Sequence, residues 1–197
     1  GVIRTRSGDV NISAKADTYL LMPSLSVSVS GGKAAVGGTI SVIVAGSRTI
    51  ADVFAGAELI SAGAAAISAA AKDKFVSALG SVSAAPSGSG AVAAAVNVLV
   101  ATAETRAKVG DGATVSAAGN AAITAESDLW MFVLGMSASG ASKAGVGASV
   151  IVNVLNRTTE ANLGKDAKLI ATDGSALVQA LGEDWVLIIG FAMGAGG

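Results

Sequence analysis

The chain contains no histidine and no cysteine, and these two absences narrow the chemistry that it can perform. Without histidine there is no Ser-His-Asp or Cys-His arrangement, no His-ligated metal ion, and no use of the commonest general base. Without cysteine there are no disulfides and no thiolate metal sites. Paired carboxylates are the remaining catalytic option, but acidic residues at the corners of a repetitive β-protein are usually solvated turn residues. We therefore expect no enzyme activity, no metal and no cofactor.

Aromatic and charged residues are scarce as well. Aromatic residues make up 4% of the 197 residues and charged residues 14%, against about 25% charged residues in an average soluble domain. Hydrophobic residues reach 52%, mostly as aliphatic side chains, beside 26 glycines. This composition favours thin, closely packed layers. The net charge is −1 and there is no basic cluster, so we expect no nucleic-acid partner.

A long apolar helix is also missing. The longest uncharged stretch, residues 75–103, is interrupted by Pro86 and by the Ser/Gly-rich residues 87–90. It does not supply the roughly 20 predominantly apolar residues of a membrane-spanning helix, and we expect no membrane insertion. A fragment of a transmembrane β-barrel remains an alternative, because apolar and polar residues alternate along the chain and its mean hydropathy is high. Its low aromatic content argues against the aromatic girdles of such proteins.

The chain does contain internal repeats. Four similar segments begin at Gly8, Gly63, Gly119 and Gly174, which are 55, 56 and 55 residues apart. A second block, Thr-x-Ala followed by Val or Leu two residues later, begins at Thr49, Thr105 and Thr159. An apolar run precedes each second block, at residues 40–44, 96–99 and 150–155. Three blocks in the same order indicate tandem repeats of about 55 residues.

Within these blocks, small or apolar residues alternate with polar ones at the period of a β-strand, and Gly- or Asp-containing turns lie between them. The sequence therefore predicts an all-β fold: one repetitive domain over residues 1–197, a parallel β-solenoid of about 3.5 repeats with one large coil per repeat. Stacked β-hairpins, such as 75–84 with 91–100, are the alternative. Residues 64–79 are rich in alanine and favour a helix by propensity. We predict a strand there, because equivalent repeats should share one structure.

Stacked coils place like residues over like residues, so the sequence predicts ladders. We expect Gly8, Gly63, Gly119 and Gly174 to lie in one line along the long axis. Asn97 and Asn153 are predicted to stack as amides that hydrogen-bond to one another. One aromatic residue per repeat is predicted to form a core or corner ladder, consisting of Tyr19, Phe75, Trp130 and Trp185.

Residues 96–125 and 147–180 resemble the repeats of very large bacterial surface exoproteins, the filamentous-haemagglutinin-like adhesins. The resemblance extends more loosely over the rest of the chain. It implies a β-solenoid shaft, secretion to the bacterial cell surface, and adhesive or scaffolding work. It brings no catalytic residues with it.

These observations predict a structural shaft segment of an extracellular adhesin or self-assembling filament. The alternative is a binding module for glycans or a host surface, with Trp130 and Trp185 as sugar-stacking platforms. The sequence starts at Gly1 and stops at Gly197, in each case inside a repeat, and residues 185–197 are uncharged. We therefore expect either end-to-end self-association or continuation in a longer chain.

Overall fold

The computed structural model describes all 197 residues and is built from β-strands and turns. It contains no helix that could span a membrane. The short strands are β1 (Val2–Arg4), β4 (Glu58–Ser61), β7 (Thr114–Ala117) and β10 (Lys168–Ala171). The long strands are β2 (Val10–Val29), β3 (Ala34–Val53), β5 (Ala65–Ala85), β6 (Gly90–Val109), β8 (Ala121–Ala141), β9 (Ala144–Leu163) and β11 (Ala176–Ala195).

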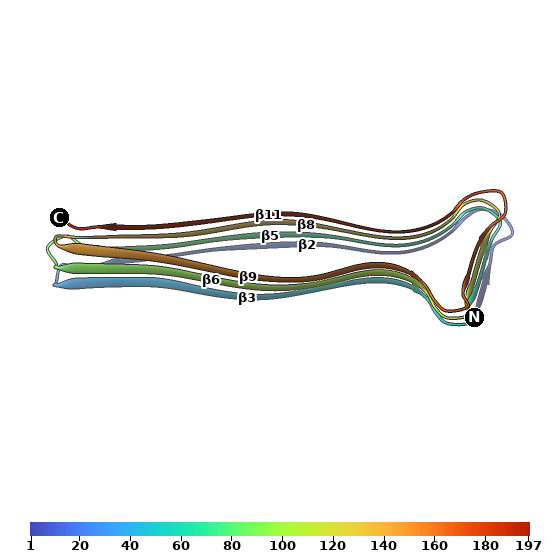
Figure 1. The fold of residues 1–197 in the computed structure, drawn as a ribbon, viewed down its shortest axis with the longest axis horizontal. Coiled ribbons are helices and arrows are strands. Elements are labelled where there is room, and N and C mark those ends of the chain that lie inside the picture. Colours follow the sequence, from blue (N-terminus) through green and yellow to red (C-terminus); the bar gives the residue numbers. More distant parts are fainter.

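Each repeat forms one coil of a parallel β-solenoid. A short strand leads through a corner into a long strand, which runs out to a tip, turns, and returns as the next long strand (Figure 1). Every strand pairs in parallel with the equivalent strand of the neighbouring coil. The result is a short sheet (β1-β4-β7-β10), a first long sheet (β11-β8-β5-β2) and a second long sheet (β3-β6-β9). The predicted solenoid is confirmed, and the alternative of antiparallel hairpins is wrong.

The long strands, rather than the stack, determine the longest dimension of the molecule (Figure 1). A strand of 20 residues extends over about 66 Å, whereas neighbouring coils lie only about 4.8 Å apart. The stack of coils is therefore a ribbon that is much wider than it is tall.

The alanine-rich segment is a strand, β5, as the comparison of repeats predicted. It lies between β2 and β8, and both neighbours pair with it in register along its length. Its alternate residues, such as Ile67 and Ala69, are buried inside the coil. Strand pairing on both sides, together with this burial, outweighs the helix propensity of alanine.

At the end of the molecule that carries the short strands, which we call the base, all three sheets enclose an apolar core. Ile67, Ile123, Val109 and Val115 are fully buried there, with alanines between them. Branched side chains pack against small ones across three inward faces, so the base has the ordinary polarity of a globular protein.

Toward the tips, only the two long sheets face one another, and the interior changes. A smaller apolar cluster around Phe75, Leu99 and Met131 lies midway along the long strands. Beyond it the inward residues are small and often polar, including Ser81, Ser83, Thr39, Ser137 and Ser139. The two sheets approach closely in this region: a Cβ at Gly147 would collide with the backbone of Met193.

Candidate functional site

The four leading glycines occupy equivalent corners of successive coils. The Gly63 amide donates a hydrogen bond to the Gly8 carbonyl (2.9 Å), and the Gly119 amide donates one to the Gly63 carbonyl (3.0 Å). The register of β8 with β11 puts Gly174 next in this line. The line follows the stacking axis, which is not the long axis that we expected, because the strands are longer than the stack. A Cβ at Gly174 would lie 2.6 Å from the Gly119 carbonyl carbon, so the corner requires glycine.

The residue after the glycine connects neighbouring coils at two of these corners. Asp9 Oδ1 accepts a hydrogen bond from the Ala64 amide (2.7 Å), and Asn120 Oδ1 accepts one from the Ser175 amide (2.9 Å). Asp111 does the same at another corner, where its Oδ1 accepts from the Lys165 amide at 2.9 Å. These side chains satisfy backbone donors that strand pairing leaves free. Glycine- and aspartate-containing segments such as residues 110–112 predict turns from the sequence, but the contacts between coils follow only from the stacking.

The predicted asparagine ladder is wrong. Asn97 pairs in register with Ile151, and Asn153 pairs with Leu99, so the two amides are offset by two positions. Asn97 instead crosses the interior of its own coil, where its Nδ2 donates to Ser77 Oγ at 2.9 Å. Asn153 has no hydrogen-bond partner for either amide atom. The two-residue shift arises at the tips, where residues 86–89 form the turn in one coil and only residues 142–143 in the next.

The aromatic ladder is correct for three residues and wrong for Phe75. Tyr19, Lys74, Trp130 and Trp185 form one column on the outer face of the first long sheet. Phe75 lies one residue further along its strand and therefore points inward, in register with Leu20 and Met131. The spacing contained this signal, because Phe75 follows its corner glycine by 12 residues, whereas each of the other aromatic residues follows by 11.

The rings in this column stack along the axis of the solenoid. The centroids of Trp130 and Trp185 are 4.9 Å apart with an interplanar angle of 7°. Lys74 Nζ lies 4.8 Å from the centroid of Trp130 and 5.8 Å from that of Tyr19, within the range of cation–π attraction. The faces of the Trp130 ring are thus covered by neighbouring coils, so a sugar could reach only the edge of this ring. Beside the column lies an open groove of about 550 Å³, lined by Lys72, Lys74, Asp128, Trp130, Glu183 and Trp185 among others.

An ion-pair network crosses three coils on the outer face of the second long sheet, near the base. Arg48 Nε lies 3.0 Å from Glu104 Oε2, and Arg106 contacts Glu104 and Glu160 at 3.0 and 2.9 Å. A hydrogen bond from the Asn162 amide lowers the pKa of Glu160 below its ordinary value, and Arg106 adds to this effect while burial opposes it. Exposed pairs of this kind contribute little to stability, but opposite charges in register favour the observed order of coils.

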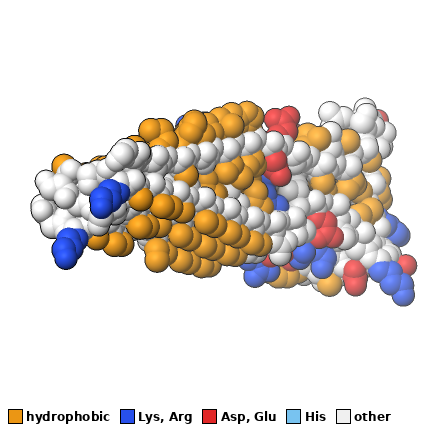
Figure 2. Space-filling view, turned by 60° about the vertical axis from the view of Figure 1, so that its left-hand side comes forward, with side chains coloured by type: hydrophobic (Ala, Val, Ile, Leu, Met, Phe, Trp, Pro, Cys, Tyr) orange, Lys and Arg blue, Asp and Glu red, His pale blue; other side chains and the backbone are white.

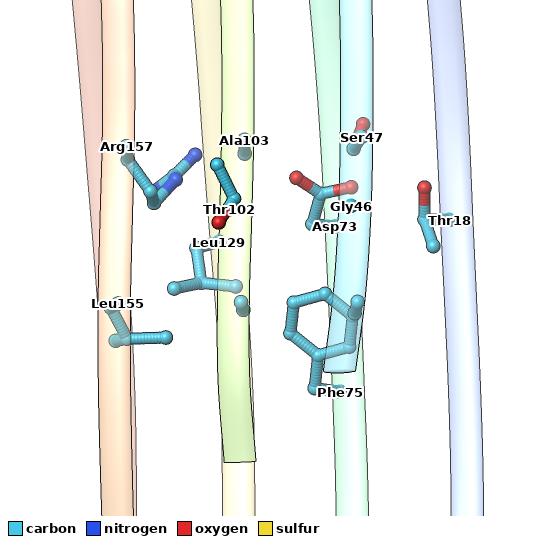
Figure 3. A pocket seen from close by; sticks show the side chains of 12 residues that line it. Thr18, Gly46, Ser47, Asp73, Phe75, Thr102, Ala103, Leu129, Leu155 and Arg157 are labelled. Atoms are coloured by element: carbon cyan, nitrogen blue, oxygen red, sulfur yellow. The ribbon is translucent and has the colours of Figure 1, made fainter. Parts of the chain in front are cut away.

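Charged side chains lie inside the coil midway along the long strands, near the level where the inward residues change from apolar to small and polar. Arg157 of β9 points inward and pairs with Asp184 of β11, and its guanidinium also donates to Ser127 Oγ. Burial lowers the pKa of Arg157, while the negative charges of Asp73 and Asp128 counteract that shift. Figure 3 shows Arg157 and Asp73 at the same level of the interior, with Phe75 and Leu155 on one side of them.

These residues line a cavity of about 20 Å³, which is close to the size that one water molecule needs. Both carboxylate oxygens of Asp73 are buried without a hydrogen-bond partner in the protein. The cavity is too small for an organic substrate, and the sheets contain no group of three or more acidic residues that could hold a metal ion. The inward-pointing charged side chains therefore form a polar layer across the coil.

The largest surface feature is apolar. From the aromatic column to the tips, the outward residues of both long sheets are almost all aliphatic or aromatic. Figure 2 shows groups of apolar side chains over this part of the face in view. On the second long sheet the outward positions form rows of valine and isoleucine, such as Val42, Val98 and Val152. Val92 remains 44% exposed although coils flank it on both sides.

No protein-family model, curated protein or solved structure matches the chain.

Proposed function

We propose that the chain is a structural segment of an extracellular adhesin or self-assembling filament at a bacterial cell surface, and that it works by stacking rather than by catalysis. The observation that carries this proposal is the in-register parallel pairing of coil upon coil. Each coil presents to the next the same strand edges that it receives from the previous one, so the architecture extends by repetition.

Both ends of the stack support the proposal. β2 and β3 lie at one end and β9 and β11 at the other, each with one edge unpaired. Such edges recruit further strands. Added coils would lengthen the ribbon by about 4.8 Å each. The segment would thus form part of a broad, rigid β-solenoid whose length depends on the number of stacked coils.

Electron microscopy and sedimentation of the purified chain test the proposal. We expect particles that elongate along the stacking axis and resist added salt, because main-chain hydrogen bonds and apolar contacts join the coils. The double variant Ile188→Lys, Ile189→Pro places a charge and a missing amide donor on the terminal strand β11, and it should shorten the particles.

A matched control is Thr102→Lys, which places a charge on an exposed position of the central strand β6 and should leave particle length unchanged. A folded monomer of the unaltered chain that persists at high concentration would contradict the proposal.

Glycan binding is the second candidate, and the groove beside Trp130 and Trp185 favours it. The stacking argues for a structural role of the column, because both faces of the Trp130 ring are covered. Trp130→Ala decides between the two: loss of a glycan-array signal with unchanged particle length supports binding. Shorter or less stable particles without any such signal support the shaft.

A further inference from the structure

The part of the solenoid nearer the tips has large apolar side chains on the outside and small polar ones on the inside. Along β2, the outward residues Tyr19, Leu21, Leu25, Val27 and Val29 are all exposed. The inward residues of the same stretch end in Ser24, Ser26 and Ser28. A sheet that faces water on its outer surface normally shows the opposite pattern. The outer surface of this part is therefore suited to an apolar environment.

The apolar surface has the same limits on both faces of the molecule. On the first long sheet it begins at the column of Tyr19 and Trp130, directly after the charged row that contains Asp17 and Asp128. On the second long sheet it begins after Gly46 and Thr102. These positions lie at one level, because Thr18, Gly46 and Thr102 line the same interior cavity. We call the region from this level to the tips the apolar band.

The apolar band has the height of the hydrocarbon core of a bilayer. Ten residues separate Tyr19 from Val29 along β2, which corresponds to about 33 Å of extended strand, and the hydrocarbon core is about 30 Å thick. Lys74 is the only charged residue on the outward faces of the band, and it lies between the rings of Tyr19 and Trp130. Lys33 and Lys143 lie in the tip turns at the far limit of the band.

The expectation of no membrane insertion rested on the lack of a long apolar helix, and the outward faces of these strands now argue against it. We propose that the apolar band enters the hydrocarbon region of a lipid bilayer, with Tyr19, Trp130 and Trp185 at one lipid–water boundary and the tip lysines at the other. A partner protein would cover one broad face and leave the other in water, whereas a bilayer surrounds both faces at one level. Alternation of apolar outward and polar inward residues over about 10 positions is the pattern of strands that contact lipid.

Backbone pairing also suits this environment. Inside the stack, parallel ladders satisfy the amides and carbonyls of the long strands along their whole length. Only the outermost strands retain free edges, and these are costly in hydrocarbon. Insertion is therefore expected to accompany stacking with further coils, and to this extent the inference rests on the proposed function. The stacking axis would then lie in the plane of the membrane.

Flotation of the full chain with neutral phosphatidylcholine vesicles tests the inference, because uncharged lipid reports apolar contact alone. We expect the chain to float with the vesicles. Trp130 and Trp185, the only two tryptophans, should be quenched more by lipids that carry bromine near the headgroup than by lipids brominated near the chain end.

Two charge substitutions, one on each face, probe the band directly. Val152→Asp on β9 and Met136→Asp on β8 should each lower vesicle partitioning about tenfold or more. Asn156→Asp and Thr124→Asp are their controls: they lie on the same strands and outer faces but outside the band, and they should leave partitioning unchanged. Val152→Thr, which keeps the branched shape, covers the case in which the aspartate variant does not fold, and it should lower partitioning by a smaller factor.

Three results would overturn the inference. One is absence of flotation by the unaltered, folded chain. Another is loss of partitioning by the aspartate variant of only one face, which would show that the chain lies on the lipid surface by that face and does not enter the bilayer. The third is lateral association of the chain in water that buries both faces, since the occupant would then be a second copy. Sedimentation without vesicles reports end-to-end stacking separately, so failure of the shaft proposal and failure of lipid binding are distinguishable.

Discussion

The base and the tips of this solenoid share one backbone but distribute their side chains in opposite ways. At the base, Ile67, Ile123 and Val115 point inward and the outer face carries charged pairs such as Arg106 with Glu160. Near the tips, Ser83 and Ser139 point inward while valines and leucines point outward. The hydrophobic effect thus holds the base together from within, whereas near the tips the apolar side chains lie on the outer surface and do not pack inside the coil.

This contrast separates two sources of stability. The tips keep their shape through the backbone ladders of their strands, which continue to the last residues of β5 and β8. Interior packing there is thin and leaves several hydroxyl oxygens without a partner, including those of Ser83, Ser137 and Ser139. We therefore expect the base to determine the global stability of the coil and the tips to tolerate changes of their interior.

The largest effect should come from a cavity in the base. Ile123→Ala removes a fully buried side chain from the main core and should lower the free energy of unfolding by about 2–5 kcal/mol. Ser137→Ala, on the same strand and the same inward face, removes a buried hydroxyl without a hydrogen-bond partner and should be neutral or raise stability by up to about 1 kcal/mol. Denaturant titration checks both, and equal losses would refute the contrast between base and tips.

A smaller effect distinguishes the two asparagines. Asn153 lies in register with Leu99 and has no amide partner, so Asn153→Leu should extend an apolar row and raise the melting temperature. Asn97→Leu removes the hydrogen bond that Asn97 Nδ2 donates to Ser77 Oγ in the buried interior. We expect Asn97→Leu to be less stable than Asn153→Leu by about 1 kcal/mol. The opposite order in thermal unfolding would mean that the register of β6 with β9 is wrong.

The smallest effect concerns pH and the charged outer face of the base. The pKa of Glu160 is lowered in the folded chain, chiefly by the Asn162 amide and also by Arg106. Its contribution is therefore present at neutral pH and is lost as the pH falls through the lowered pKa of the carboxyl group. Because the pair is exposed, the change should stay below about 0.5 kcal/mol.

Two substitutions check this origin of the pH dependence. Glu160→Gln should remove the component of the acid dependence that Glu160 causes, and Asn162→Ala should reduce it. Unfolding midpoints at pH 7 and pH 3 provide the measurement. An unchanged acid dependence in both variants would show that the carboxylate does not contribute.

The sequence by itself determined the repeat length, the strand character of the alanine-rich segment, the coil per repeat and the corner glycines. Each of these follows from spacing and period, which are local or additive properties. The two ladder predictions that were wrong, the positions of Phe75 and Asn153, failed because of strand register. Phe75 lies one residue out of step with Tyr19, which turns its side chain to the opposite face. Asn153 lies two residues out of step with Asn97, because the tip turn of its coil is shorter.

Only the tertiary structure decided which of the two faces of each strand points inward. Alternation defines two faces, but period two is the same whether the apolar set is inside or outside. Along β2 the inward set changes from Val10 and Ile12 at the base to Ser26 and Ser28 near the tip without any break in the strand. The corners of the coil and the packing of the two long sheets against each other decide which side chains of a strand point inward. The contacts between the two sheets join residues that are far apart in the chain.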